Sequence, residues 1–201
     1  MTQNHYCAII IPGLGDNDSR LRWATTSWAS RGIDPLFFPV GWRDNEIHFQ
    51  PKLERLLAYI DTQPKNYTTI SLIGTSAGGS VAINAFCERK NTIHRAVNVY
   101  GRLRMWAQKG FRSYAARTAS SPSFAEAVTQ CELNVKKLRA RDLKKIMTVR
   151  AQFGDELVPA DTTTIPGCRN ITLPTFEHVF SIALAMSILS RPIIQFLLEE
   201  D

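Results

Sequence analysis

Short apolar runs alternate with longer amphipathic segments along the chain. Six runs are rich in β-branched and aromatic residues, which is typical of strands buried in a parallel sheet. They span residues 6–11, 36–40, 69–73, 96–100, 146–151 and 170–173. The pattern therefore predicts about six strands, and their nearly continuous apolar character favours a sheet that is covered on both faces.

Helices are predicted between these strands by apolar residues that recur every three to four positions. The first helix begins at Asp18 or Ser19, either of which can cap it, and stops near Gly32. The others cover about residues 53–60, 76–87 and most of 101–145, and a last helix starts near His178. Strands that alternate with helices indicate an α/β fold with a mainly parallel sheet, built as a three-layer α/β/α sandwich.

The length and composition suit one globular domain. The chain has 201 residues, of which 44% are hydrophobic and 21% are charged, and we expect residues 1–201 to form a single domain. No apolar run is long enough to cross a bilayer, and the N-terminal residues carry no secretory signal. A cytoplasmic location is the resulting expectation.

Positive charge is concentrated in one stretch of the chain. The net charge is +6, but residues 102–150 contain twelve Lys or Arg against three Asp or Glu, so the remainder is negative. This stretch overlaps the helical region at about 102–145, which we interpret as a basic insert or lid. A solvated basic face explains the charge, and so does attraction to an anionic substrate or an acidic membrane surface. No recognition motif or aromatic platform indicates nucleic-acid binding.

The cysteines give no signal for a metal or a cofactor. Cys7, Cys87, Cys131 and Cys168 are scattered and lack the C-x-x-C spacing of zinc sites. In a reducing compartment we expect them to be buried free thiols. We therefore predict neither a metal nor a cofactor.

Residues 74–78, Gly-Thr-Ser-Ala-Gly, join the third predicted strand to the helix that follows. They have the G-x-S-x-G pattern of a nucleophile elbow, in which the serine stands at the tip of a sharp, strained turn. The flanking glycines let strand and helix approach closely, and the helix N-terminus points its N–H groups at charge that develops beside the serine. Ser76 is the candidate nucleophile, and a glycine-rich turn without chemistry is the alternative.

A serine nucleophile needs a base, and the base needs a group that orients it. Ligands of parallel sheets bind beyond the carboxyl ends of the strands, and His178 is the histidine that follows the last predicted strand. The others precede a strand or a helix and are His5, His48 and His94. Asp155 follows a glycine turn after the fifth strand and is the preferred acid, with the neighbouring Glu156 as the alternative.

Together these motifs resemble those of a small α/β-hydrolase. The elbow, the segment Gly-Asp-Glu-Leu-Val-Pro at 154–159 and the pair Glu177-His178 occur in that family's order of Ser, Asp and His. The resemblance spans nearly the whole chain and implies an α/β-hydrolase fold with the triad Ser76, Asp155 and His178. The family's two leading antiparallel strands have no counterpart, because the first predicted strand starts at Tyr6.

The resemblance also implies an oxyanion hole. One donor would be the backbone N–H of Ala77, directly after the serine, and the other would come from the loop after the first strand, where we choose Leu14. Many family members begin this loop with His-Gly, whereas this chain has Pro12-Gly13.

Several side chains are candidates for contact with a substrate. Arg102 and Arg104 directly follow the fourth strand, and one of them would favour a substrate with a carboxylate or phosphate. Trp42, at the tip of the second strand, walls the pocket or packs in the core. Four aromatic residues of the region at 101–145 are expected either to line an acyl site or to pack helices onto the sheet. They are Trp106, Phe111, Tyr114 and Phe124.

The leading hypothesis is hydrolysis of a small-molecule carboxylic ester or thioester through an acyl-enzyme on Ser76. His178 would act as base and then as acid, while Asp155 holds its tautomer. The same triad could cleave an amide or a carbon–carbon bond, because it does not identify the leaving group. The alternative from another class is a catalytically idle α/β-hydrolase fold that binds a ligand or a partner.

Overall fold

The structure, a computed structural model, describes residues 5–105 and 121–200. Its strands, in chain order, are β1 (Tyr6–Ile11), β2 (Ile33–Phe37), β3 (Thr69–Thr75), β4 (Ile93–Val99), β5 (Ile146–Ala151) and β6 (Arg169–Leu173). They form one sheet in the order β2-β1-β3-β4-β5-β6, and every neighbouring pair is parallel. The predicted sheet of about six mainly parallel strands is confirmed.

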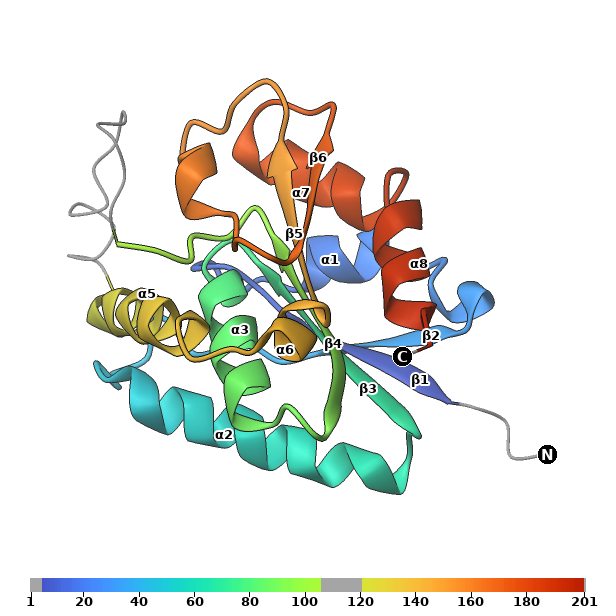
Figure 1. The fold of residues 1–201 in the computed structure, drawn as a ribbon, viewed down its shortest axis with the longest axis horizontal. Helices are drawn as coiled ribbons and strands as arrows, with labels where there is room; N and C mark the ends of the chain where they lie inside the picture. The colour runs from blue at the N-terminus through green and yellow to red at the C-terminus, as the bar shows by residue number, and fades with distance from the viewer. Residues whose placement is uncertain (1–4, 106–120, 201) are drawn as a thin grey trace.

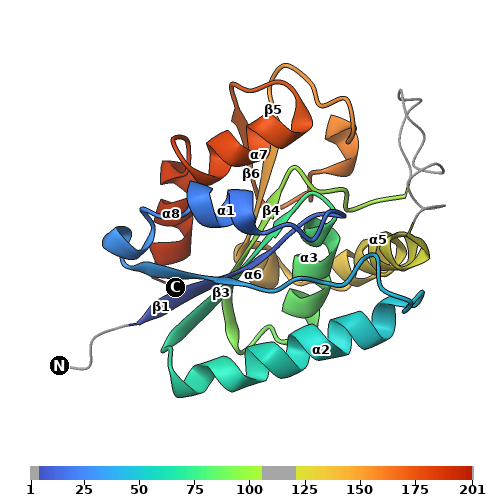
Figure 2. The same ribbon diagram turned by 180° about the vertical axis from the view of Figure 1, so that it is seen from behind.

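Helices cover both faces of this sheet (Figure 1 and Figure 2). They are α1 (Ser19–Ala24), α2 (Phe49–Thr62), α3 (Gly78–Glu88), α5 (Pro122–Val135), α6 (Ala140–Leu143), α7 (His178–Met186) and α8 (Arg191–Leu198). Short 3₁₀ turns are η1 (Ala29–Arg31), η2 (Gln63–Lys65) and η3 (Ala160–Thr162). The helices α1, α7 and α8 lie on one face and α2, α3 and α5 on the other, which is the predicted three-layer sandwich.

The strand β1 shows why the apolar runs are continuous. Ile9 and Ile11 belong to the core under α2 and α3, whereas Ala8 and Ile10 belong to the core under α1, α7 and α8. All four side chains are fully buried. Successive side chains of a strand point to opposite faces, so a strand between two helical layers needs apolar residues at every position.

The second strand lies three residues earlier than predicted. The expected strand was 36–40, but β2 spans Ile33–Phe37 and places Pro35 opposite Ala8. Proline lacks an N–H and argues against a central strand, but β2 is at the edge of the sheet, where only one side must be hydrogen-bonded. The edge position of β2 therefore explains why the predicted bounds of this strand were wrong.

The first helix is shorter than the predicted segment that stops near Gly32. The helix α1 ends at Ala24, and the buried Thr25 donates its Oγ1 hydrogen to the carbonyl of Leu21 at 2.8 Å. Gly32 closes η1 instead, with φ of 85°. Neither predicted cap acts through its side chain on α1, because Asn17 Oδ1 accepts the N–H of Ser19.

The predicted last helix is in fact two helices, α7 and α8. Met186 at the end of α7 accepts a hydrogen bond on its carbonyl from the indole of Trp28 at 2.9 Å, and Ile193 and Phe196 of α8 are fully buried on the same face of the sheet. Within the described ranges no single helix is long and apolar enough to cross a membrane. The helices α7 and α8, which are bent by 53° relative to each other, reach that length and apolar composition only when they are counted together.

The predicted helical region at 101–145 is helical at α5 and α6. The helix α5 packs on α3, where the buried side chain of Asn84 donates to the carbonyl of Ala127 at 2.9 Å. Trp106, Phe111 and Tyr114 lie outside the described residues. A lid role for this region stays a prediction.

All four cysteines are free thiols; Cys7 and Cys131 are buried as predicted, whereas Cys87 and Cys168 are half-buried. Burial raises the pKa of Cys7, Cys87 and Cys168 to about 12, and burial also raises the pKa of Cys131. Because the thiolate is the nucleophile, the raised pKa lowers the reactivity of these thiols in the folded chain.

At pH 9 we expect alkylation of Cys7, Cys87 and Cys168 to be roughly several hundred-fold slower in the native protein than in the unfolded chain. A raised thiol pKa stabilises the fold below the ordinary thiol pKa, and this contribution is lost as the pH rises toward the folded value of about 12. Pulsed iodoacetamide labelling with and without denaturant, read by mass spectrometry, measures both rates. Equal rates for Cys7 in the two states would contradict the prediction.

Candidate active site

Ser76 stands at the junction of β3 and α3, in a left-handed backbone conformation with φ of 52°. Its N–H donates to the carbonyl of Val99 at 3.0 Å, which fixes the turn to the neighbouring strand. A Cβ on Gly74 would lie 2.1 Å from the carbonyl oxygen of Gly78, and one on Gly78 would lie 2.1 Å from that of Ile11. The G-x-S-x-G pattern is therefore required by close backbone packing around a strained serine.

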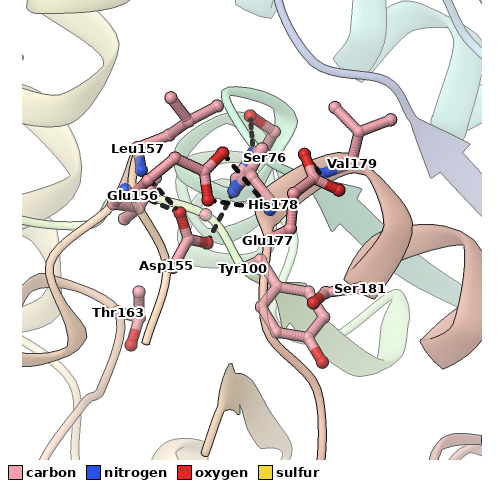
Figure 3. Close-up of polar contacts among 12 residues, drawn as sticks. Ser76, Tyr100, Asp155, Glu156, Leu157, Thr163, Glu177, His178, Val179 and Ser181 are labelled. Atoms are coloured by element: carbon pink, nitrogen blue, oxygen red, sulfur yellow. Dashed lines mark hydrogen bonds and ion pairs between the residues drawn. The ribbon is translucent and has the colours of Figure 1, made fainter. Parts of the chain in front are cut away.

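His178 reaches Ser76 from the first turn of α7. The preceding residue, Glu177, has φ of 67° and caps the helix, accepting the N–H groups of Val179 and Phe180 at 3.1 and 2.7 Å. The imidazole is only 3% exposed, and its Nε2 lies 2.8 Å from Ser76 Oγ (Figure 3). This distance suits transfer of the serine proton to the ring.

Asp155 contacts the other ring nitrogen of His178. Its Oδ2 lies 2.6 Å from Nδ1, while its Oδ1 accepts the N–H groups of Leu157 and Val158 at 2.8 and 2.9 Å (Figure 3). The two N–H donors hold the carboxylate in one orientation. A carboxylate at Nδ1 favours the tautomer that carries its proton there and leaves Nε2 as an acceptor for Ser76.

Glu156, the alternative acid, does not contact the imidazole ring. Its carboxylate accepts the backbone N–H of His178 at 3.2 and 3.4 Å. The two neighbouring acids thus divide two tasks, since Asp155 holds the ring and Glu156 holds the backbone that carries it.

The loop after β1 lies directly over the serine. A Cβ on Gly13 would be 2.9 Å from Ser76 Cβ and 3.2 Å from its Oγ. Among the described residues, neither the N–H of Leu14 nor that of Ala77 has an acceptor in the protein. The two donors chosen from the sequence therefore remain available to a ligand.

Asp16 fixes this loop, although no motif in the sequence singled it out. Its φ is 47°, and its carboxylate accepts the N–H groups of Val40 and Trp42 at 2.8 and 2.6 Å, which ties the loop to the exit of β2. An aspartate after Leu-Gly is consistent with a left-handed turn, which Asp tolerates, but no local signal identifies N–H partners 24 and 26 residues further along the chain.

Tyr100 is a second residue that the sequence did not single out. It follows β4 with φ of 55°, and its hydroxyl lies 2.9 Å from Thr175 Oγ1, in the segment that leads to His178. Burial is the main cause that raises the pKa of its phenol, and the charge of Asp155 adds to it. A neutral phenol there supports the loop without adding charge beside the triad.

Two cavities adjoin Ser76. The larger, the Ser76 cavity, has a volume of about 300 Å³ and opens between the loop after β1 and the helix α7. It is lined by Pro12, Gly13, Leu14, Gly15, Asp16, Asn17, Arg20, Leu21, Thr75, Ser76, Leu157, His178, Val179, Ile182 and Ala183. The smaller, about 20 Å³, lies on the side of Ala77 and Arg102.

The residues predicted to contact a substrate lie at different places. Arg102 lines the small cavity, but it is 6% exposed and donates from Nε and Nη2 to the carbonyls of Arg104 and Met105 at 2.9 and 2.7 Å. Arg104 lines neither cavity at Ser76 and donates to the carbonyl of Thr164.

The aromatic residues predicted to contact a substrate also lie at different places. Phe124 lines the small cavity and packs edge-on against Trp42, with 5.8 Å between the ring centroids. Trp42 is buried behind it and lines neither cavity. Trp106 lies outside the described residues, so its contact with a substrate stays a prediction.

The remaining histidines lie away from Ser76. His48 pairs with Glu126 at 3.0 Å, and His94 lies 2.9 Å from the carbonyl of Glu199. Within residues 5–105 and 121–200, no three His, Cys, Asp or Glu side chains meet in a way that could hold a metal ion.

Comparison with solved structures identifies the fold. The chain superposes on Est1E from Butyrivibrio proteoclasticus with ferulic acid bound, at a TM-score of 0.66 and 14% identity, over 98% of this chain and 91% of that one. A metagenome-derived lipolytic enzyme matches with a TM-score of 0.66 and 10% identity over 96% and 91% of the two chains. The thioesterase domain of the curacin biosynthetic pathway matches with a TM-score of 0.62 and 12% identity over 98% and 92%.

This chain therefore has the α/β-hydrolase fold, as the sequence motifs predicted. No protein-family model and no curated protein matches its sequence. At identities this low the likeness concerns the fold, and function must be argued from the site.

Proposed function

We propose that this chain is a serine hydrolase that cleaves a carboxylic ester or thioester through an acyl-enzyme on Ser76. The observation that carries the proposal is the continuous path of short contacts from Ser76 Oγ to His178 Nε2 and from His178 Nδ1 to Asp155. A packed loop has no need of a strained serine, a buried imidazole and a carboxylate in this order.

Each residue has a defined part in the reaction. His178 Nε2 takes the proton of Ser76 as its Oγ attacks the carbonyl carbon of the ester, and the imidazolium then gives that proton to the leaving alcohol or thiol. Water then attacks the acyl-enzyme by the same proton transfers through His178, which releases the carboxylic acid and restores the Ser76 hydroxyl. Asp155 keeps Nδ1 protonated throughout and stabilises the imidazolium.

The negative charge on the carbonyl oxygen is stabilised by the N–H groups of Leu14 and Ala77. Both lack an acceptor among the described residues, and the loop after β1 is held over the serine by Asp16. Removal of one such donor typically costs about 3–4 kcal/mol of transition-state stabilisation. Gly13 brings this loop as close to Ser76 as the lack of a side chain allows.

The Ser76 cavity supports a small-molecule substrate. Its volume of about 300 Å³ is at the lower end of ligand sites, and its walls are mainly apolar. Solved structures with the same fold include proteins described as lipolytic enzymes and as a thioesterase domain, which favours esters and thioesters over amides or carbon–carbon bonds.

We expect a fluorophosphonate probe to label the wild-type protein and to leave Ser76→Ala unlabelled, because the probe reacts with a serine activated by a base. Ser19→Ala is a matched control, since Ser19 is exposed at the start of α1 near the cavity and hydrogen-bonds only Asn17 through its hydroxyl among the described residues. Gel fluorescence and mass spectrometry of the modified peptide give the readout.

Two outcomes would contradict the proposal. Folded wild-type protein that takes up no probe would favour a catalytically idle fold that binds a ligand or partner. Labelling of Ser76→Ala at the wild-type rate would place the reactive residue elsewhere.

A further inference from the structure

The walls of the Ser76 cavity are mainly apolar. Leu14, Leu21, Val179, Ile182 and Ala183 provide an apolar surface beside the serine. The charged and amide side chains other than His178 all come from one segment, where they are Asp16, Asn17 and Arg20. Apart from His178, the charged and amide groups of the cavity thus come from the segment that leads into α1.

Two of these three polar side chains are already engaged by the protein. The Asp16 carboxylate accepts two backbone N–H groups, from Val40 and Trp42. Asn17 Oδ1 accepts the N–H and the hydroxyl of Ser19 at 3.0 and 2.7 Å. The oxygen atoms of these two side chains therefore hold the loop after β1 in its conformation.

Arg20 differs from both. It is exposed, it lines the Ser76 cavity, and it forms no hydrogen bond or ion pair with the described part of the chain. A guanidinium group carries five N–H donors in a planar fork that matches a carboxylate. Arg20 therefore presents an unused anion-binding group to the cavity that contains Ser76.

Arg22, two residues further along the same helix, is by contrast bound to neighbouring side chains. Its Nε donates to Asp18 at 2.8 Å, its Nη2 lies 2.7 Å from the same carboxylate, and its guanidinium lies 4.3 Å from the centre of the Phe37 ring. Arg102, at the other cavity, is also engaged, because two of its nitrogens donate to backbone carbonyls. Of the three arginines on α1 or beside Ser76, Arg20 is the one that has no hydrogen bond or ion pair with the described part of the chain.

The charge balance decides between the two common anions. A phosphate monoester carries about 1.5 to 2 negative charges at neutral pH, whereas Arg20 supplies a single positive charge and has the Asp16 carboxylate on the same cavity wall. A nearby carboxylate opposes a second negative charge on the ligand. A monoanionic carboxylate matches the site.

We propose that the substrate is an ester or thioester that also bears a carboxylate, which Arg20 binds in the Ser76 cavity while the apolar part of the substrate lies between the two groups. The inference rests on the proposed hydrolase function and adds the charge of the substrate to it. It moves the anion-binding role expected of Arg102 or Arg104 to a different arginine, which lines the larger of the two cavities at Ser76.

The test compares pairs of esters that differ in one carboxylate. The first pair places the charge on the acyl side, as p-nitrophenyl hemiglutarate against p-nitrophenyl valerate. The second places it on the leaving group, as 4-acetoxybenzoate against 4-methylphenyl acetate. For wild type we expect one carboxylate-bearing ester to be preferred over its neutral partner by about tenfold in kcat/KM at 0.15 M salt.

Substitutions then assign the preference to one side chain. Arg20→Ala should bring the ratio of kcat/KM for that pair close to one through a higher KM for the carboxylate ester, and Arg20→Glu should invert it. Arg20→Lys should restore part of the ratio, because it keeps the charge but loses the planar fork. Arg22→Ala is the matched control and should keep the wild-type ratio, since Arg22 does not line the cavity.

A wild-type ratio near one for both pairs, or an equal loss in Arg20→Ala and Arg22→Ala, would overturn the role of Arg20. These results differ from failure of the proposed function itself. In that case no ester of either pair is hydrolysed, and the fluorophosphonate probe leaves Ser76 unmodified.

Discussion

Replacement of Asp155 by asparagine is expected to lower kcat for ester hydrolysis by about 10⁴-fold while the fold is retained. The N–H groups of Leu157 and Val158 both donate to Oδ1, so the asparagine oxygen must take that place. The amide nitrogen then faces His178 Nδ1, where the carboxylate Oδ2 lies in the native chain. An NH₂ group can only donate there, which forces the ring proton onto Nε2 and removes the acceptor that Ser76 requires.

Glu156→Gln is the matched control for this substitution. It changes the neighbouring carboxylate to an amide, but its carbonyl oxygen can still accept the backbone N–H of His178. We expect a loss of less than about tenfold, because the ring tautomer is unaffected. Steady-state kinetics on a p-nitrophenyl ester, with circular dichroism of each variant, make the comparison. Equal losses for the two variants would show that control of the His178 tautomer by Asp155 does not cause the loss.

The site could be predicted from the sequence because its residues depend on chain order and on local turns. A parallel sheet brings the carboxyl ends of its strands to one edge, so the residues after β3, β5 and β6 had to meet there. Ser76, Asp155 and His178 lie at these ends, and Ser76 and Asp155 are each within hydrogen-bond distance of His178. The glycines around Ser76 marked the place where β3, α3 and the end of β1 approach most closely.

Residues that act through distant partners could not be found in this way. Asp16 binds N–H groups about 25 positions further along the chain, and no local pattern specifies that pairing. The same applies to β2, whose register against β1 depends on its place at the sheet edge rather than on its own residues. The order of the strands in the sheet, and thus which strand is the edge, is set by packing of the whole chain.

The sequence alone also could not identify which arginine is available to bind an anion. Sequence position placed Arg102 and Arg104 near the site, and Arg102 does line a cavity at Ser76. Whether a guanidinium is available depends on what else it contacts, and Arg102 contacts backbone carbonyls two and three residues away. Arg20, on the exposed start of α1, carries no motif in the sequence, and only the geometry relates it to the serine.

Gly74→Ala is expected to lower the free energy of unfolding by about 3 kcal/mol or more, because the added Cβ meets backbone that cannot move independently. The atom would lie 2.1 Å from the carbonyl oxygen of Gly78 and 2.6 Å from Gly79 Cα, so α3 would have to shift away from β3. For a chain of this size the loss corresponds to a fall in Tm of roughly 6–12 °C. The smaller entropy of the unfolded alanine chain offsets at most about 1 kcal/mol of it.

Gly15→Ala separates this steric effect from the loss of a glycine as such. Its added Cβ would have no neighbour closer than 4.0 Å, and the position has no left-handed φ. We therefore expect its stability to stay within about 0.5 kcal/mol of wild type or to rise slightly. Urea unfolding followed by tryptophan fluorescence gives both values. If Gly74→Ala were as stable as Gly15→Ala, the close approach of β3 and α3 would not be what requires glycine, and the first glycine of the elbow would lose its physical explanation.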